Sequence, residues 1–79
     1  MTHYLLAIDQ GTTSSRAIVF SLSGESLSQH QIDLKQFYPK PGWVEQDPLE
    51  IWQNTYLCCQ EALKKLNLTA RDIAAIGIS

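Results

Sequence analysis

Two short apolar runs, separated by a segment of small and hydroxyl-bearing residues, open the chain. The first run lies within His3–Asp9 and the second within Arg16–Ser21. Neither run alternates polar with apolar residues, so each is predicted to be a strand that is buried on both faces. The segment between them, Gln10–Ser15, is rich in glycine, threonine and serine, which is typical of a tight turn. A buried hairpin is therefore expected at the start of the fold.

Further turns, strands and a loop extend this pattern along the chain. Leu22–Glu25 carries a Ser-Gly turn signal. Ser26–Phe37 follows and alternates polar with apolar residues near its end, which predicts a half-exposed third strand near a sheet edge. Tyr38–Asp47 contains two prolines and a glycine and is expected to be a loop. Beyond the helix described next, a short capped turn at Thr69–Asp72 leads to a last apolar strand at Ile73–Ile78.

A single helix is expected between the third and fourth strands. Asp47 can accept hydrogen bonds from free N–H groups, Pro48 suits the first helical position, and Glu50 completes a capping box. The helix is expected to end at Leu66 or Asn67. Its apolar residues fall at steps of four and three and form one stripe, which we predict to be its core face: Trp52, Tyr56, Cys59, Leu63 and Leu66.

The resulting order, β-β-β-α-β, predicts an α/β fold with a mixed sheet. A strand that follows a helical crossover normally lies parallel in the same sheet, through a right-handed connection. One helix covers only one face of that sheet, although the first two strands are apolar on both faces. Because the last strand ends at Ser79 with no turn or helix after it, we expect these 79 residues to be part of a larger protein.

Composition excludes several classes of function. The formal net charge is −2, which gives no electrostatic footprint for nucleic acid or for an anionic membrane. No apolar run approaches the roughly 20 residues that span a bilayer, and nothing resembles a signal peptide, so a cytoplasmic protein is expected.

Cys58 and Cys59 are adjacent, which makes a disulfide between them sterically awkward, and buried reduced thiols are expected instead.

The turn between the first two strands carries the chemistry. Successive N–H groups in a tight turn form a concavity that suits phosphate, and Gly11 lets a ligand approach the backbone closely. Hydroxyl groups at the next three positions add donors: Thr12, Thr13 and Ser14. We therefore expect these four residues to bind phosphate groups.

Two charged residues flank the turn. Arg16 adds a cation at the base of the second strand, and Asp9, at the end of the first, could hold Mg²⁺ through its waters. Oxyanion donors, a cation and a metal carboxylate are what a nucleoside triphosphate requires. The pattern is not a P-loop, and an ordinary hairpin turn remains the alternative.

The residues Asp9–Ala17 resemble the first phosphate motif of the FGGY carbohydrate kinases, in the actin/hexokinase/Hsp70 ATPase superfamily. Tyr38–Pro48 and Ile73–Ser79 resemble two further segments of that family, so the resemblance extends along the whole chain. The strings Asp-Gln-Gly-Thr-Thr-Ser-Ser-Arg and Tyr-Pro-Lys-Pro are typical of its glycerol-phosphorylating branch. Pentulose kinases share only a looser Gly-Trp-x-Glu-x-Asp-Pro.

This resemblance implies a fold, a reaction and residue roles. The fold would be the N-terminal β-β-β-α-β part of an RNase H-like domain, the first of two domains. The reaction would be transfer of the ATP γ-phosphoryl group to glycerol, giving sn-glycerol 3-phosphate, with ATP and Mg²⁺ required and a homo-oligomer expected. Asp9 would orient the Mg²⁺ hydration shell, and Arg16 would bind the phosphate end of the nucleotide. Thr12, Thr13 and Ser14 would bind the ATP phosphates.

The same resemblance implies functional residues beyond this chain. Substrate-binding residues are expected just after Ser79, and the catalytic base and the second domain further on, so the 79 residues alone are expected to be inactive. Two other functions remain open. One is an FGGY kinase for another polyol or a pentulose such as xylulose, and the other is a non-catalytic module that binds a nucleotide or a partner.

Overall fold

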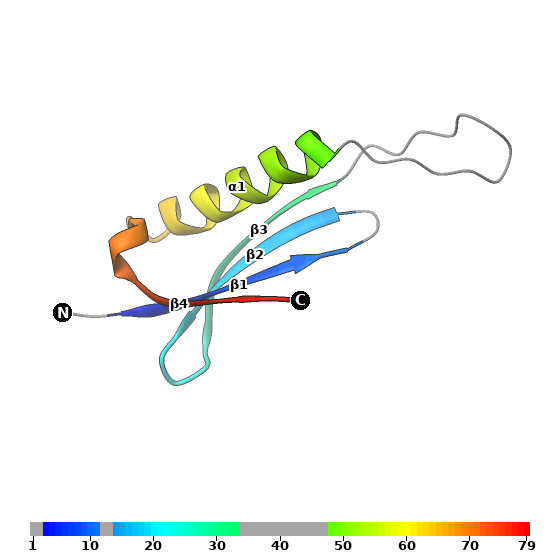
Figure 1. Cartoon of the computed structure of the whole chain (residues 1–79). Helices are drawn as coiled ribbons and strands as arrows, with labels where there is room; N and C mark the ends of the chain where they lie inside the picture. The colour runs from blue at the N-terminus through cyan, green and yellow to red at the C-terminus, as the bar shows by residue number, and fades with distance from the viewer. Residues whose placement is uncertain (1–2, 12–13, 34–47) are drawn as a thin grey trace, which may run out of the picture.

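The computed structural model describes residues 3–11, 14–33 and 48–79, which form a four-stranded sheet with one long helix on one face (Figure 1). The strands are β1 (Tyr4–Gln10), β2 (Ser14–Ser21), β3 (Ser26–Asp33) and β4 (Ile73–Ile78), in the spatial order β3-β2-β1-β4. The first three form an antiparallel meander, whereas β4 lies parallel to β1. The predicted β-β-β-α-β order and mixed sheet are confirmed.

The register of β1 against β2 gives the hairpin two distinct faces. Leu6 lies opposite Val19 and Ile8 opposite Ala17, and these pairs point toward the helix. Leu5 and the other alternate residues point to the opposite face, because successive side chains of a strand alternate. A short second turn at Leu22–Glu25 is confirmed, since the Gly24 N–H donates to the Ser21 carbonyl at 3.0 Å. Gly24 has a φ of 90°, a conformation that favours glycine.

Strand β3 forms one edge of the sheet, as predicted, and pairs only with β2 among the described strands. Its residues alternate between half-buried and exposed, because only one face packs beneath the helix. The prediction extended this strand from Ser26 to Phe37, whereas the described strand ends at Asp33 and residues 34–37 lie outside the described residues.

Helix α1 (Pro48–Lys64) packs across β2 and β3 and makes few contacts with β1. Its buried residues are Cys58, Ala62 and Leu63. The predicted core stripe is therefore wrong in part, because Trp52 and Tyr56 are 66% and 56% exposed and stack on each other, with ring centroids 6.5 Å apart. Small side chains, rather than the aromatic ones, let the helix backbone lie close to the sheet.

The helix ends slightly earlier than predicted. After Lys64 the chain turns, and the Leu68 N–H donates to the Leu63 carbonyl at 3.0 Å. Asn67, with a φ of 57°, adopts the left-handed conformation that terminates this motif, so the predicted end at Leu66 or Asn67 falls within the terminating turn. At the other end, the predicted cap residue Asp47 lies outside the described residues.

A short 3₁₀ turn η1 (Ala70–Asp72) then leads into β4. The Thr69 N–H donates to Asp72 Oδ2 at 2.8 Å, and the Asp72 N–H donates to the Thr69 carbonyl at 3.0 Å. These two bonds confirm the capped turn predicted at Thr69–Asp72.

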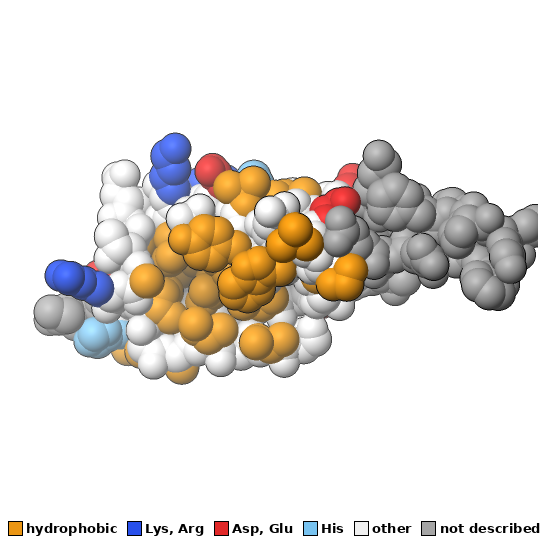
Figure 2. All heavy atoms as spheres, turned by 45° about the horizontal axis from the view of Figure 1, so that its top comes forward, with side chains coloured by type: hydrophobic (Ala, Val, Ile, Leu, Met, Phe, Trp, Pro, Cys, Tyr) orange, Lys and Arg blue, Asp and Glu red, His pale blue; other side chains and the backbone are white. Residues whose placement is uncertain are grey.

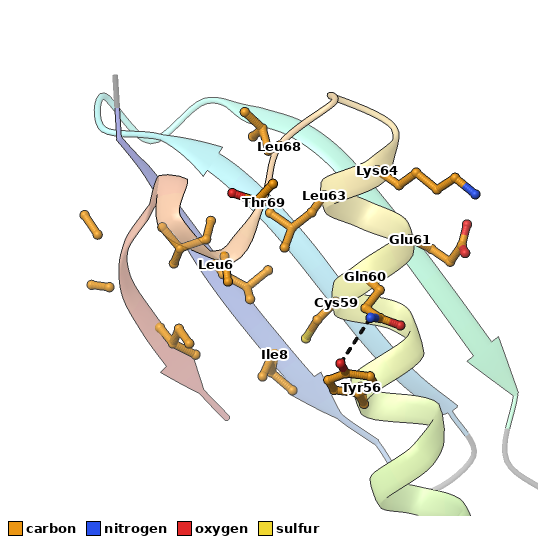
Figure 3. Close-up of a pocket in the computed structure, with 15 residues that line it drawn as sticks. Leu6, Ile8, Tyr56, Cys59, Gln60, Glu61, Leu63, Lys64, Leu68 and Thr69 are labelled. Atoms are coloured by element: carbon orange, nitrogen blue, oxygen red, sulfur yellow. Dashed lines mark hydrogen bonds between the residues drawn. The ribbon is translucent and has the colours of Figure 1, made fainter. Parts of the chain in front are cut away.

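Apolar surface remains open on both sides of the β1–β4 half of the sheet. A groove of about 960 Å³ lies between α1 and β4, lined by Leu6, Tyr56, Leu63 and Ile76 among others (Figure 3). Hydrophobic side chains accordingly gather on the helix-bearing face of the molecule (Figure 2). On the opposite face, Leu5 and Phe20 line a shallow apolar hollow with β4. In the described part of the chain, no helix is long and apolar enough to cross a membrane.

Candidate phosphate-binding site

The predicted site lies at one end of the sheet, where the turn joins β1 to β2. Because β4 is parallel to β1, the carboxyl ends of both strands meet there. The Ser79 N–H donates to the Ile8 carbonyl at 3.0 Å, and the Gln10 N–H donates to the Ser79 carbonyl at 3.2 Å. Figure 1 shows the first turns of α1 at the same end. Ligands of α/β sheets bind preferentially outside the carboxyl ends of parallel strands.

A backbone hydrogen bond joins Gly11 and Ser14, the two described residues of the turn. The Gly11 N–H donates to the Ser14 carbonyl at 2.8 Å, and Gly11 is exposed to solvent. Ser14 begins strand β2. Thr12 and Thr13 lie outside the described residues, so their predicted phosphate contacts stay predictions.

Gly11 has no conformational reason to be a glycine. Its φ lies outside the positive range, in which Gly24 is the only described glycine. A Cβ built on it would meet the Ser14 carbonyl oxygen at 3.4 Å, which is ordinary van der Waals contact. Among the described residues, nothing therefore excludes a methyl group here, and a bare backbone at this position is compatible with the predicted close approach of a ligand.

Asp9 and Arg16 form an ion pair beside the turn. They are direct neighbours in the register, and Arg16 Nη2 donates to Asp9 Oδ2 at 2.8 Å. Alternation along β1 places the pair on the sheet face opposite α1. Both side chains are well exposed, 48% for Asp9 and 39% for Arg16. Such exposed pairs contribute only about 0–1 kcal/mol to stability, so ligands can compete for both partners.

The residues present fit a magnesium ion held through water. Among the described residues, Asp9 Oδ1 makes no hydrogen bond, while Oδ2 is held by Arg16. Mg²⁺ usually keeps several waters and binds proteins through one or two carboxylates plus substrate phosphates. A single half-exposed carboxylate next to the predicted phosphate-binding turn has that character.

A second cluster beside the turn was missed from the sequence. Gln10 Oε1 accepts from Ser15 Oγ at 2.9 Å and lies 2.9 Å from Thr55 Oγ1 of helix α1. Ser15 is completely buried, and Gln10 Nε2 is buried without a hydrogen-bond partner in the described residues. Strand alternation could have placed Gln10 and Ser15 on the helix side, but the sequence held no signal for Thr55, 45 residues away.

The two cysteines are described, and both are free thiols. Burial raises the pKa of the Cys58 thiol above its ordinary value of 9.0, and Cys58 Sγ donates to the Ser15 carbonyl at 3.3 Å. Burial and the neighbouring Cys58 also raise the pKa of Cys59. Both thiols therefore stay protonated near neutral pH, which makes them poor nucleophiles. Of the predicted buried, reduced thiols, both are free, but only Cys58 is buried, whereas Cys59 is half-buried.

The sequence matches the profile of the FGGY family of carbohydrate kinases, N-terminal domain, over residues 4–79. The chain belongs to this family. Among curated relatives, it is 60% identical over 79 residues to Glycerol kinase 1 of Pseudomonas aeruginosa, and 51% identical to the glycerol kinase of Coxiella burnetii. Each match covers all of this chain and 16% of the relative, so the chain spans about one sixth of their length.

Solved structures of the family show the same fold. Plasmodium falciparum glycerol kinase with ADP matches at a TM-score of 0.78 with 28% identity, covering 99% of this chain and 15% of that one. Gluconate kinase from Lactobacillus acidophilus matches at 0.80 with 25% identity, covering 100% and 15%. These neighbours confirm the predicted RNase H-like, actin-like ATPase fold.

Proposed function

We propose that this FGGY chain forms the N-terminal part of the first domain of an ATP-dependent glycerol kinase. The observation that carries the proposal is the 51–60% identity to glycerol kinases along the entire chain. Fold similarity alone does not select the substrate, because a gluconate kinase and a xylulose kinase superimpose as well as a glycerol kinase at 25–28% identity. A cytoplasmic homo-oligomer is part of the same proposal.

In this reaction a primary hydroxyl oxygen of glycerol bonds to the γ-phosphorus of ATP while the bond to the ADP oxygen breaks, and the hydroxyl proton leaves to a base. Phosphoryl transfer depends mainly on positioning and on stabilising negative charge. The turn from Gly11 to Ser14 would bind phosphate oxygens, with Arg16 as a cation beside them. Mg²⁺, oriented by Asp9, would neutralise phosphate charge. Glycerol-binding residues and the base would lie outside residues 1–79.

The test uses the full-length protein that carries residues 1–79, called the completed protein below, since these residues correspond to 16% of the length of the Pseudomonas aeruginosa relative. ADP release is measured with MgATP and, in turn, glycerol, xylulose, ribulose and gluconate. Glycerol-dependent turnover is expected. Turnover with a pentulose or gluconate but not glycerol would overturn the substrate, and a folded protein without turnover would favour a non-catalytic module.

Asp9→Asn is the variant that tests the site. It removes the charge that orients the metal's waters, so we expect kcat/KM to fall by about 10–100-fold, the usual effect of losing an outer-shell metal partner. Glu25→Gln is the matched control, because Glu25 is an exposed carboxylate in the turn between β2 and β3, at the other end of these strands. Equal losses in both variants, or an unaffected Asp9→Asn, would remove Asp9 from the metal site.

A further inference from the structure

Three side chains from two distant parts of the chain meet directly behind the β1–β2 turn. Gln10 and Ser15 are opposite each other in the register, and they flank the turn at its two ends, next to Gly11 and Ser14. Thr55, in the second turn of α1, reaches both: its Oγ1 lies 2.9 Å from Gln10 Oε1 and 3.5 Å from Ser15 Oγ. The helix is thereby tied to both ends of the turn through one cluster.

The protons in this cluster make its members interdependent. Thr55 Oγ1 also lies 2.8 Å from the Ile51 carbonyl, and a hydroxyl carries one proton, so it can donate to only one of its two acceptors. When Thr55 donates to Ile51, Gln10 must supply the proton of their shared contact. Gln10 can supply it only with its amide oxygen and nitrogen exchanged, which would bring the buried, unpartnered Nε2 to this contact. Either orientation of the Gln10 amide therefore allows a hydrogen bond between Gln10 and Thr55.

The cluster differs in burial from the ion pair on the other face of the hairpin. Asp9 and Arg16 occupy the adjacent register position and are exposed, so water and ligands compete with their pairing. Ser15 is completely buried, and the amide nitrogen Nε2 of Gln10 is also buried, without a hydrogen-bond partner among the described residues. Hydrogen bonds in such surroundings are costly to break and hold their groups in place.

We propose that Thr55 is a positioning residue which, through Gln10 and Ser15, fixes the two described ends of the β1–β2 turn, Gly11 and Ser14, for the binding of ATP phosphates. Thr55 itself lies behind the turn, on the helix side, and acts by fixing where the two ends of the turn lie. The proposal rests on the function proposed above, because it needs the turn to be the phosphate site.

The experiment compares Thr55→Val and Thr55→Ser in the completed protein, with Gln53→Ala as a control at an exposed position of the same helix. Valine keeps the shape of threonine but cannot hydrogen-bond, whereas serine keeps the hydroxyl. We expect Thr55→Val to raise the KM for ATP about three- to tenfold, the effect of one lost neutral hydrogen bond, with the KM for glycerol unchanged. Thr55→Ser and Gln53→Ala are expected to stay within about twofold of the parent.

Hydrogen exchange supplies a readout that does not depend on catalysis. The Gly11 amide, which donates across the turn to Ser14, is expected to exchange faster in Thr55→Val than in Thr55→Ser. A purely structural role would lower the melting temperature of Thr55→Val and leave both the KM for ATP and Gly11 exchange unchanged, which would overturn the proposal. A KM for ATP that rises equally in the valine and serine variants would also overturn it.

The two proposals fail differently. If the parent completed protein does not phosphorylate glycerol while the Pseudomonas aeruginosa enzyme does in the same assay, the proposed function fails and the positioning role fails with it. If the parent is active and Thr55→Val binds ATP normally, only the positioning role is wrong.

Discussion

At Gly11, the question is whether a glycine is needed for folding or for binding a ligand. A glycine is required by the fold where φ is positive, as at Gly24, or where a Cβ would clash. At Gly11, φ is not positive, and no described residue would clash with a Cβ. The described residues therefore give no reason for a glycine at this position, and close approach of a nucleotide phosphate is the use that the proposed function gives it.

Gly11→Ala is expected to weaken ATP binding without weakening the fold. Alanine restricts the unfolded chain at a position whose native conformation it can adopt, which stabilises by about 0.4–1 kcal/mol. We therefore expect the melting temperature of the completed protein to stay level or rise, and the KM for ATP to increase at least about fivefold. Thermal unfolding and ADP release on the same preparation check this. An unchanged KM for ATP would mean that no ligand approaches Gly11.

The site residues were predictable only where the signal was local. Asp9 and Arg16 were identified singly from the turn motif, and strand alternation accounts for their shared face. Thr55 was not identifiable, because its contact with Gln10 depends on how α1 is rotated and placed over the sheet. Sequence periodicity specifies neither the rotation nor the placement closely enough to identify one hydroxyl.

At the scale of one element, helix α1 illustrates why the most hydrophobic residues of a helix need not be its most buried ones. Counting apolar residues favoured the aromatic stripe, but the face against β2 and β3 is made of Cys58, Ala62 and the half-buried Thr55. The strands beneath carry small residues too, including the buried Ala17, so close packing selects small partners there. Within the stripe, Tyr56 and Cys59 line the groove toward β4, together with the buried Leu63, as Figure 3 shows.

This orientation of α1 predicts opposite outcomes for two substitutions. Trp52→Ala removes a largely exposed side chain and is expected to cost less than about 1 kcal/mol, compared with about 3–5 kcal/mol for a buried tryptophan. Ala62→Leu overpacks the contact with the sheet and is expected to cost about 1–3 kcal/mol. Urea unfolding of the chain at low protein concentration, followed by helical circular dichroism, measures both. A larger loss for Trp52→Ala than for Ala62→Leu would contradict this orientation.

At the scale of the whole molecule, the order and pairing of the elements followed from simple rules. Short runs between turn signals predicted the hairpins, and the helical crossover predicted that β4 lies parallel to β1. The same rules predicted an uncovered sheet face, and Leu5 and Phe20 line an open apolar hollow there. They did not predict the second opening, on the helix side, because it arises from the placement of α1 over β2 and β3.

The two openings meet at β4, which is an edge strand with apolar side chains exposed to solvent. Ile76 is 59% exposed and lines both the groove and the hollow. Exposed apolar surface beside an unpaired strand edge promotes association, and a lysine on such an edge opposes it. We therefore expect the 79-residue chain to bind a hydrophobic dye and to sediment as larger species as its concentration rises. Ile76→Lys is expected to reduce both effects.

Leu22→Lys is the matched control for that experiment. Leu22 is as exposed as Ile76, but it lies in the turn between β2 and β3, away from the groove and the hollow. If association comes from the surface around β4, Leu22→Lys leaves it unchanged while Ile76→Lys lowers it. Equal effects of the two lysines would assign association to net charge, and a chain that stays monomeric without binding dye would show that these openings do not drive it to associate.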